Sequence, residues 1–321
     1  MSAPWVVGWG RSLNVTFIRN LAALPPAFQA GALTIGNFDG VHRGHVALAE
    51  QLLETARAAD GPAVAFTFEP HPVQVLRPEI APVPLVWPER KVELLEGLGI
   101  DLVVAYPTDL DFLSLLAEEF FEKVVREHLD AQAVIEGDDF CFGHNREGTI
   151  ETLGSFCDSA GIGLHVVASI LLEGEVVSSS RIRALVELGE MTRVMQMLSR
   201  PHRVRGLVAR GAARGATIGF PTANLEEIPN LAPAAGVYAG QAHWQRETCP
   251  AAIHIGPNPT FAEERAKFEV HLIGFEGDLY GEWLEVDIVE RLRGTQTFDS
   301  PEALQEQLRQ DVQQAARIQA K

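Results

Sequence analysis

Residues 31–45 read GALTIGNFDGVHRGH, and this stretch decides the fold of the first half of the chain. The run from Gly31 to Ile35 is short and apolar, as in a buried strand. A glycine-containing turn follows, and a helical pattern begins at His45. A strand that turns directly into a helix is typical of a parallel α/β sheet, whose ligands bind at the carboxyl ends of the strands. We therefore expect a ligand at the turn between Gly36 and His45.

The same alternation continues through the first two-thirds of the chain. Short apolar runs predict further strands, and helical patterns lie between several of them. The expected strands are 31–35, 63–68, 102–106, 133–135 and 164–167, and the expected helices include 45–59 and 117–129. This order predicts a mostly parallel, doubly wound sheet.

The pattern changes near residue 200. Short strand-like segments separated by Gly and Pro follow one another without intervening helices, which favours a small antiparallel barrel or sandwich. The expected strands are 203–210, 236–244, 251–255, 268–275 and 283–290, and a polar helix is expected over 301–318. We place the boundary just before Pro201, with one domain at residues 1–198 and the second at 199–321.

Composition limits the classes of partner. With 321 residues and a net charge of −17, the chain suits two domains and repels nucleic acid and anionic membranes. No apolar run approaches the roughly 20 residues that span a bilayer. Residues 1–12 lack a signal-peptide pattern, and the three cysteines are scattered. We expect a cytoplasmic protein with neither nucleic acid nor membrane as a partner; the sequence does not predict its oligomeric state.

The turn before the first helix carries two histidines, His42 and His45, spaced to lie on one face of a helical turn. A helix start offers unpaired N–H groups and a positive dipole, which suit a phosphate, and imidazole can donate to phosphate oxygens. Surface histidines or a metal site remain alternatives on spacing alone, although nearby Cys or further His at ligand spacing is missing.

The segment Gly-x-Phe-Asp-Gly-x-His-x-Gly-His at residues 36–45 resembles the nucleotidyltransferase superfamily and, in its full length, prokaryotic FAD synthetase. Three later segments resemble the same family: Thr67 to Pro72, Gly137 to Gly143 and Ser178 to Arg183. Cys141 stands where that family more usually has Arg, and Ser180 where it has Thr. The resemblance implies a Rossmann-like, nucleotidyltransferase-like sheet that transfers AMP from ATP to FMN.

The resemblance also implies roles for individual residues. His42 and His45 would stabilise the α-phosphate transition state, and Arg183 would hold the pyrophosphate end. Asp138, Asp139 and Phe140 would contact the flavin. The remaining residues implied to bind ATP and its phosphates in this half are Gly36, Asn37, Phe38, Gly44, Ser179 and Ser180. Mg²⁺ is expected to bridge ATP oxygens.

A second glycine-rich loop, Gly211 to Asn224, begins the other half and contains Arg214. Its end, Gly219 to Asn224, resembles the riboflavin kinase signature, as do Ile255 to Phe261, Phe268 to His271 and Asp278 to Gly281. The likeness implies a small β-barrel. Gly211, Arg214 and Gly219 would bind ATP phosphates, and Thr222 and Asn224 would hold phosphates and Mg²⁺.

Glu269 is implied to take the proton from the riboflavin 5′-hydroxyl. The alternation of Phe268, Val270 and Leu272 equally allows Glu269 to be an outward strand residue without a catalytic role. Two departures bear on this half: Ala216 stands where the family usually has Arg, and Ser199 where it has Gly.

Three hypotheses for function follow from these residues. The first is a bifunctional enzyme that phosphorylates riboflavin to FMN and adenylylates FMN to FAD, with ATP, riboflavin and FMN as its small-molecule partners. The second is an adenylyltransferase whose kinase half is impaired by Ala216. The third is a flavin-binding or flavin-sensing protein without turnover, which would have no need of His42, His45 and Glu269.

Overall fold

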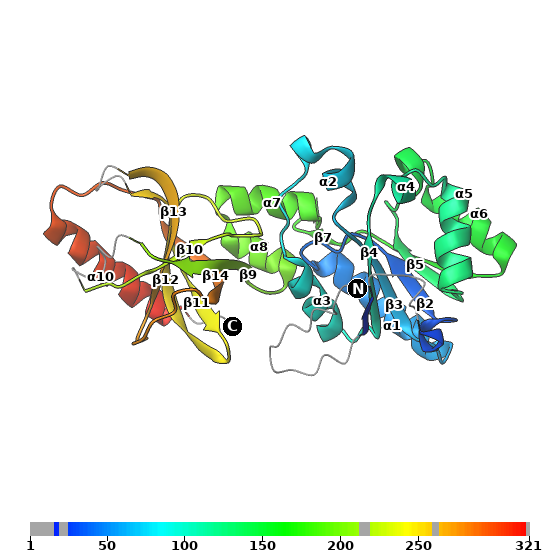
Figure 1. Cartoon of the computed structure of the whole chain (residues 1–321), viewed down its shortest axis with the longest axis horizontal. Coiled ribbons are helices and arrows are strands. Elements are labelled where there is room, and N and C mark those ends of the chain that lie inside the picture. Colours follow the sequence, from blue (N-terminus) through cyan, green and yellow to red (C-terminus); the bar gives the residue numbers. More distant parts are fainter. Residues whose placement is uncertain (1–15, 19–24, 212–218, 259–262, 319–321) are drawn as a thin grey trace. The chain divides into compact units, whose positions relative to one another are not determined.

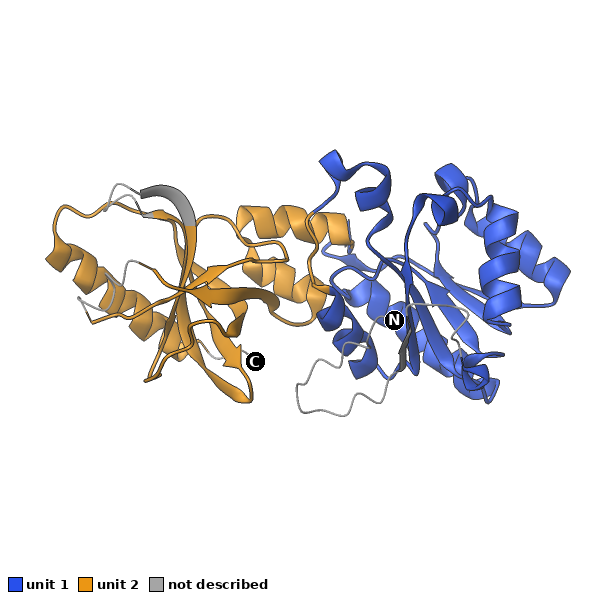
Figure 2. Ribbon diagram, viewed as in Figure 1, with its two compact units in different colours: residues 1–82, 88–177 blue, residues 83–87, 178–321 orange. Residues whose placement is uncertain are grey.

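The chain forms two compact units in a computed structural model that describes residues 16–18, 25–211, 219–258 and 263–318. Unit 1 comprises residues 1–82 and 88–177, and unit 2 comprises residues 83–87 and 178–321 (Figure 2). Each unit has its own sheet.

Unit 1 contains six parallel strands in the order β1-β4-β3-β2-β5-β6 (Figure 1). The strands are β1 (Thr16–Ile18), β2 (Ala32–Ile35), β3 (Ala63–Glu69), β4 (Leu102–Pro107), β5 (Ala133–Gly137) and β6 (Gly163–Val167). A separate antiparallel pair follows, β7 (Leu171–Leu172) and β8 (Glu175–Val176). The predicted parallel sheet is confirmed, with β1 added at its edge.

Helices cover both faces of this sheet because its strands are apolar on both sides. In β3, Ala63 and Ala65 pack in the cluster that contains α1 (Arg43–Ala58) and α3 (Pro88–Gly97). Val64 and Phe66 point to the opposite cluster. That cluster contains residues of α4 (Leu110–Leu113), α5 (Ala117–Phe120), the π-helix η4 (Phe121–His128) and α6 (Ile150–Ala160). The short helices of this unit are η2 (Pro26–Phe28), α2 (Pro72–Leu76), η3 (Pro78–Ile80) and η5 (His144–Arg146).

Unit 2 is a closed barrel of six antiparallel strands in the order β10-β13-β12-β11-β14-β9. The strands are β9 (His202–Ala209), β10 (Ala223–Glu226), β11 (Gly236–Trp244), β12 (Glu247–Asn258), β13 (Glu263–Leu272) and β14 (Trp283–Arg293). The terminal helix α10 (Pro301–Arg317) packs on β11 and β12 through Ala315, which meets Ala239 and Ala252. The predicted barrel with a terminal helix is therefore confirmed, and the sandwich alternative is wrong.

Helices α7 (Ser179–Leu188) and α8 (Met191–Leu198) belong to unit 2, where α8 packs on β9 and β14. The compact units thus divide the chain between Val177 and Ser178. The domain boundary at residues 198/199, drawn from the change of sequence pattern, stays a prediction.

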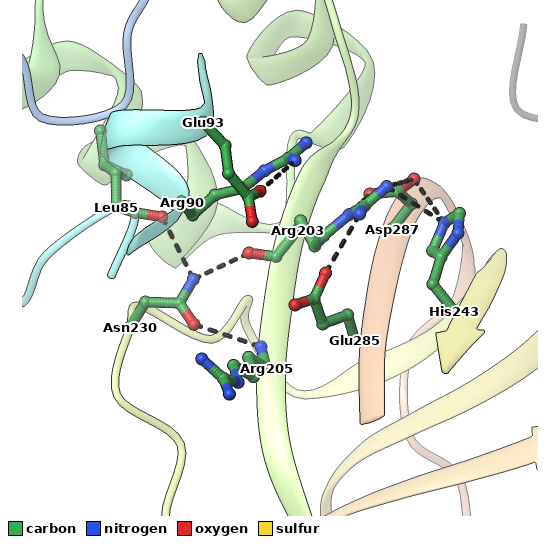
Figure 3. A network of polar contacts seen from close by, with 9 residues as sticks. All are labelled: Leu85, Arg90, Glu93, Arg203, Arg205, Asn230, His243, Glu285 and Asp287. Atoms are coloured by element: carbon green, nitrogen blue, oxygen red, sulfur yellow. Dashed lines mark hydrogen bonds and ion pairs between the residues drawn. The ribbon is translucent and has the colours of Figure 1, made fainter. Parts of the chain in front are cut away.

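The segment Val83–Trp87 is held in unit 2 by a polar network around Asn230 (Figure 3). The Asn230 amide nitrogen donates to the Leu85 carbonyl at 3.1 Å and to the Arg203 carbonyl at 2.8 Å, and its oxygen accepts from the Arg205 backbone N–H at 3.3 Å. Asn230 is 3% exposed, so these bonds satisfy a buried amide that would otherwise be costly to desolvate.

Candidate active sites

The first candidate site lies at the point in unit 1 where the strand order reverses, between β2 and β5. β2 pairs with β3 along its whole length but with β5 only at Ala32 and Leu33. The loops after β2 and β5 emerge at this point, at the carboxyl ends of the strands. Open parallel sheets bind ligands at such a point.

A carboxylic acid fills the gap where β2 and β5 separate. Glu136 of β5 is 1% exposed, and its Oε1 accepts the Ile35 backbone N–H at 2.6 Å. Burial raises the pKa of Glu136 well above its ordinary value, against the effect of the Ile35 hydrogen bond, and the charge of Asp139 adds to the rise. We did not predict a role for Glu136, although a lone carboxylate inside an apolar strand was a usable signal.

His42 and His45 lie together at the start of α1. His42 is its N-cap residue and is 6% exposed, and the two imidazole rings stack with centroids 3.7 Å apart. Nδ1 of His45 accepts the His42 backbone N–H at 3.3 Å, so a neutral His45 carries its proton on Nε2. The predicted helix start is confirmed, and the pair presents imidazole beside a helix N-terminus.

The glycines of this turn make room for rings. A Cβ on Gly44 would lie 3.1 Å from two atoms of the His42 ring, and one on Gly36 would lie 3.2 Å from the Phe38 ring. Phe38 is 2% exposed and meets His45 edge-on at 5.2 Å between centroids. The buried Phe38 ring thus packs against the His45 imidazole and restricts its position.

Asn37 contributes a buried acceptor to the same turn. Its Oδ1 is buried and has no hydrogen-bond partner within the described residues, whereas its backbone carbonyl accepts from the Thr67 hydroxyl at 3.2 Å. An unsatisfied buried acceptor at the carboxyl end of a parallel strand is suited to a donor on a ligand.

A buried lysine supports this turn from α3. Lys91 Nζ lies 3.4 Å from Thr67 Oγ1 and 3.9 Å from Glu69 Oε2. Burial lowers the pKa of Lys91, while the negative charges of Glu69 and Asp39 act in the opposite direction. Sequence reasoning missed Lys91 because a single lysine in an amphipathic helix carries no signal of burial. The Glu69–Pro70 peptide bond is cis, and His71 then caps α2 by accepting the Val73 N–H at 3.1 Å.

The predicted flavin residues lie on the loop after β5. Asp138 accepts from the Ser169 hydroxyl at 2.7 Å and from its backbone N–H at 3.3 Å, and these bonds lower the pKa of Asp138. Asp139 is exposed. Phe140 stacks on Phe142 at 5.5 Å and packs against the core. The loop is therefore held by Asp138 on one side and by Phe140 on the other, and both aspartates are exposed.

The remaining predicted residues of the first site, Ser179, Ser180 and Arg183, belong to unit 2, at the start of α7. Ser178 is the N-cap residue of α7, and its hydroxyl accepts the Arg181 N–H at 3.3 Å. Arg183 Nε donates to the Val83 carbonyl at 2.9 Å.

The second candidate site lies on one row of the barrel in unit 2. Strand register places Glu269 of β13 directly opposite Asn224 of β10 on one side and His254 of β12 on the other. Directly paired residues present their side chains on the same face, with Cβ atoms about 4.5–5.5 Å apart. The barrel therefore brings together the predicted Asn224 and Glu269, and it adds His254, which we did not predict.

Gly211, which follows β9, lies close to this row. A Cβ on Gly211 would lie 2.1 Å from the Asn224 amide nitrogen, so the absence of a side chain at residue 211 lets the Asn224 amide lie against the backbone. Thr222 directly precedes β10, and Gly219 adopts a φ of +88°. The predicted Arg214, and Ala216, which replaces the usual Arg, lie outside the described residues.

The donor set suits a magnesium ion that ATP brings with it. Thr222 and Asn224 offer oxygen donors, which Mg²⁺ prefers, and Mg²⁺ in phosphate-transfer sites takes few protein ligands. Within the described residues, no group of three or more His, Cys, Asp or Glu side chains could hold a metal ion by itself.

A helix start that bears two stacked histidines on a parallel sheet, together with a barrel that carries an Asn–Glu–His row, fits a nucleotide-dependent transferase built from two units. The FAD synthetase family matches residues 25–181, and the riboflavin kinase family matches residues 198–319. The chain belongs to the bifunctional riboflavin kinase/FMN adenylyltransferase family.

Individual relatives support this membership over nearly the full chain. The protein of that name from Escherichia coli (strain K12) is 34% identical over 92% of this chain and 95% of its own length. Its counterpart from Pseudomonas fluorescens is 34% identical over 94% and 97%. A solved structure from Streptococcus pneumoniae, named a macrolide-efflux protein, matches with a TM-score of 0.83 and 30% identity, covering 96% of this chain and all of that one (100%). No helix in the described part of this chain is long and apolar enough to cross a membrane.

Proposed function

We propose that this chain makes FAD in two steps: it transfers the γ-phosphoryl group of ATP to riboflavin, and then the AMP group of a second ATP to FMN, releasing pyrophosphate. Support comes from the names of the curated relatives and from the presence of both matched families in one chain. The single observation that carries the two-step assignment is the row Asn224–Glu269–His254, because a protein that only adenylylates FMN does not need it.

In the adenylylation step, an FMN phosphate oxygen attacks the α-phosphorus of ATP in line, and the bond to pyrophosphate breaks. The transition state gathers negative charge at the α-phosphate, which preorganised donors stabilise. We assign this role to Nε2–H of His45 and to His42. Arg183, Ser179 and Ser180 would bind the phosphates, and the Asn37 oxygen would accept a donor of the nucleotide.

The other predicted residues of this half serve binding. Gly36, Phe38 and Gly44 shape the turn that receives ATP. Asp138, Asp139 and Phe140 would contact the flavin from the loop after β5, where Asp138 and Asp139 are both exposed.

In the kinase step, the riboflavin 5′-oxygen forms a bond to the γ-phosphorus, the bond to ADP breaks, and the hydroxyl proton passes to the Glu269 carboxylate. Phosphoryl transfer depends on positioning and charge stabilisation more than on covalent help. Thr222 and Asn224 would hold Mg²⁺, which neutralises phosphate charge when it is bound. Gly211, Gly219 and Arg214 would contact the ATP phosphates.

Parallel assays test the proposal. Purified protein receives ATP and Mg²⁺ with either riboflavin or FMN, and FAD is measured. FAD from both flavins supports the proposal. FAD from FMN alone indicates a kinase half impaired by Ala216, and FAD from neither indicates a flavin-binding protein without turnover. We also place the enzyme in the cytoplasm, which fractionation of its cells would test.

A further inference from the structure

His254 is a histidine that the kinase mechanism above does not use. It lies on β12 in register with Glu269 of β13, and Glu269 is in register with Asn224 on its other side. Cross-strand partners share a face of the sheet. Glu269 is therefore flanked by an amide on one strand and by an imidazole on the other.

The imidazole nitrogen nearest the carboxylate is buried. Nδ1 of His254 lies 3.5 Å from Oε2 of Glu269, and within the described residues this nitrogen makes no hydrogen bond. The side chains are 25% and 18% exposed, so both are screened by protein while still reachable from solvent. A buried ring nitrogen that faces a carboxylate at this distance needs only a small adjustment of the glutamate to form a hydrogen bond.

We infer that His254 positions Glu269 for the kinase step, an inference that rests on the role proposed for Glu269. Nδ1–H of His254 donates to Oε2 and thereby fixes the carboxylate, so that the other oxygen, Oε1, faces the riboflavin hydroxyl. The last torsion of a glutamate side chain is otherwise broad, and the carboxylate would spend time in orientations that cannot accept the proton. His254 touches neither substrate, so its effect appears in turnover and not in binding.

Three substitutions distinguish the roles of the two ring nitrogens of His254. His254→Asn places an amide nitrogen where Nδ1 was, His254→Gln places one where Nε2 was, and His254→Leu has the size of Asn without a donor. We expect His254→Asn to keep kcat for FMN formation within about 3-fold of the wild type. His254→Gln and His254→Leu should lose about 10- to 100-fold, the scale of a small misplacement of a catalytic group. KM for riboflavin and for ATP should change by less than about 3-fold in all three.

His243 offers a matched control on the same barrel. It also pairs with a carboxylate, with Nε2 at 2.8 Å from Asp287 Oδ2. It lies opposite Thr248 on β12, six residues from His254, or about 20 Å along the strand. His243→Asn should leave kcat for FMN formation unchanged even if it lowers the melting temperature.

The ratio of kcat between His254→Asn and His254→Gln tests the inference. Both variants carry the same amide group and should change the free energy of unfolding by similar amounts, so they differ mainly in which ring nitrogen the amide replaces. A ratio of about 10 or more supports it, and a ratio near one overturns it. Glu269→Gln tests the underlying assignment separately and should lower kcat by at least about 10²-fold. If Glu269→Gln turns over normally, the assignment of Glu269 fails. If Glu269→Gln is inactive while the ratio is near one, only the positioning role of His254 fails.

Discussion

At the scale of single residues, His45 has the most constrained chemistry. Its Nδ1 accepts the His42 N–H, so Nε2 is the nitrogen that can donate to a phosphate. His45→Ala should lower FAD formation from FMN by roughly 10²-fold, the usual loss for one preorganised donor, and should leave FMN formation near normal. His165, an exposed histidine on β6 of the same unit, provides the control, and His165→Ala should change neither activity. Equal loss of both activities in His45→Ala would point to misfolding and contradict the assignment.

Glu136 is a residue whose effect should depend on pH. Because its folded pKa is raised above the ordinary value of 4.5, the stability it contributes is complete below pH 4.5 and is lost as the pH rises through the folded pKa. Glu136→Gln cannot ionise, and its amide oxygen can still accept the Ile35 N–H. We therefore expect the variant to gain stability relative to the wild type on going from pH 5 to pH 8, by up to about 1.4 kcal/mol for each pH unit of titration.

Thermal unfolding followed by circular dichroism at pH 5 and pH 8 measures this gain. Parallel changes in wild type and variant would mean that Glu136 is ionised in the folded protein.

At the scale of secondary structure elements, the pairing of β9 with β14 contains a buried ion pair. Arg203 Nε donates to Asp287 Oδ1 at 2.6 Å, and the aspartate side chain is 9% exposed. Burial opposes ionisation of Asp287, but hydrogen bonds from His243 and Arg203 outweigh it and lower its pKa to about 2. The stability from this group is therefore present above the ordinary pKa of 3.8 and is lost as the pH falls toward 2.

Asp287→Asn should destabilise unit 2 by about 2 kcal/mol at pH 7, the free energy that corresponds to lowering the pKa from 3.8 to about 2, while Arg203 keeps its ion pair with Glu285 at 3.1 Å. The difference from wild type should shrink as the pH approaches 2. Urea unfolding followed by tryptophan fluorescence at pH 7 and at pH 3 measures the difference, and three of the five tryptophans, Trp87, Trp244 and Trp283, belong to unit 2. A constant difference between pH 7 and pH 3 would contradict the pKa shift.

The element scale also shows what the sequence could and could not predict. Both sheets, the start of α1 and the terminal helix were predictable because they depend on local periodicity and turn residues. The neighbours of Glu269 were not, because alternation identifies the face of a strand and leaves its register open. His254 is 15 residues from Glu269 in the chain, and only the register of β12 with β13 brings the two together. The burial of Lys91 was not predictable because it depends on elements that are distant in sequence, whereas the position of Glu136 inside an apolar strand was a signal that we did not use.

At the scale of the whole molecule, the compact units predict how the chain can be cut. Val194, Met197 and Leu198 of α8 are at most 3% exposed, and α8 packs on β9 and β14. A fragment of residues 178–321 keeps this helix, whereas one of residues 199–321 loses it. Each buried apolar side chain contributes about 1.5–3 kcal/mol, so the shorter fragment should be several kcal/mol less stable.

Urea unfolding of the two fragments measures the difference. Both should phosphorylate riboflavin under native conditions and make no FAD. Equal stabilities would mean that α8 contributes nothing to the barrel.

The position of the segment Val83–Trp87 in unit 2 limits where two related chains can be recombined. The chain passes between the two units at three places, after Pro82, after Trp87 and after Val177. The Leu231 N–H donates to the Pro84 carbonyl at 2.8 Å, and Leu85 is fully buried. The side chains of Val83–Trp87 must therefore match the surface of the barrel that they contact. A hybrid that joins the first half of one relative to the second half of another at a single crossover would take residues 83–87 from one parent and the barrel from the other. The contacts between this segment and the barrel would then be mismatched. Viable recombinants should therefore carry residues 83–87 and the barrel from the same parent, although more than 90 residues separate them in the gene.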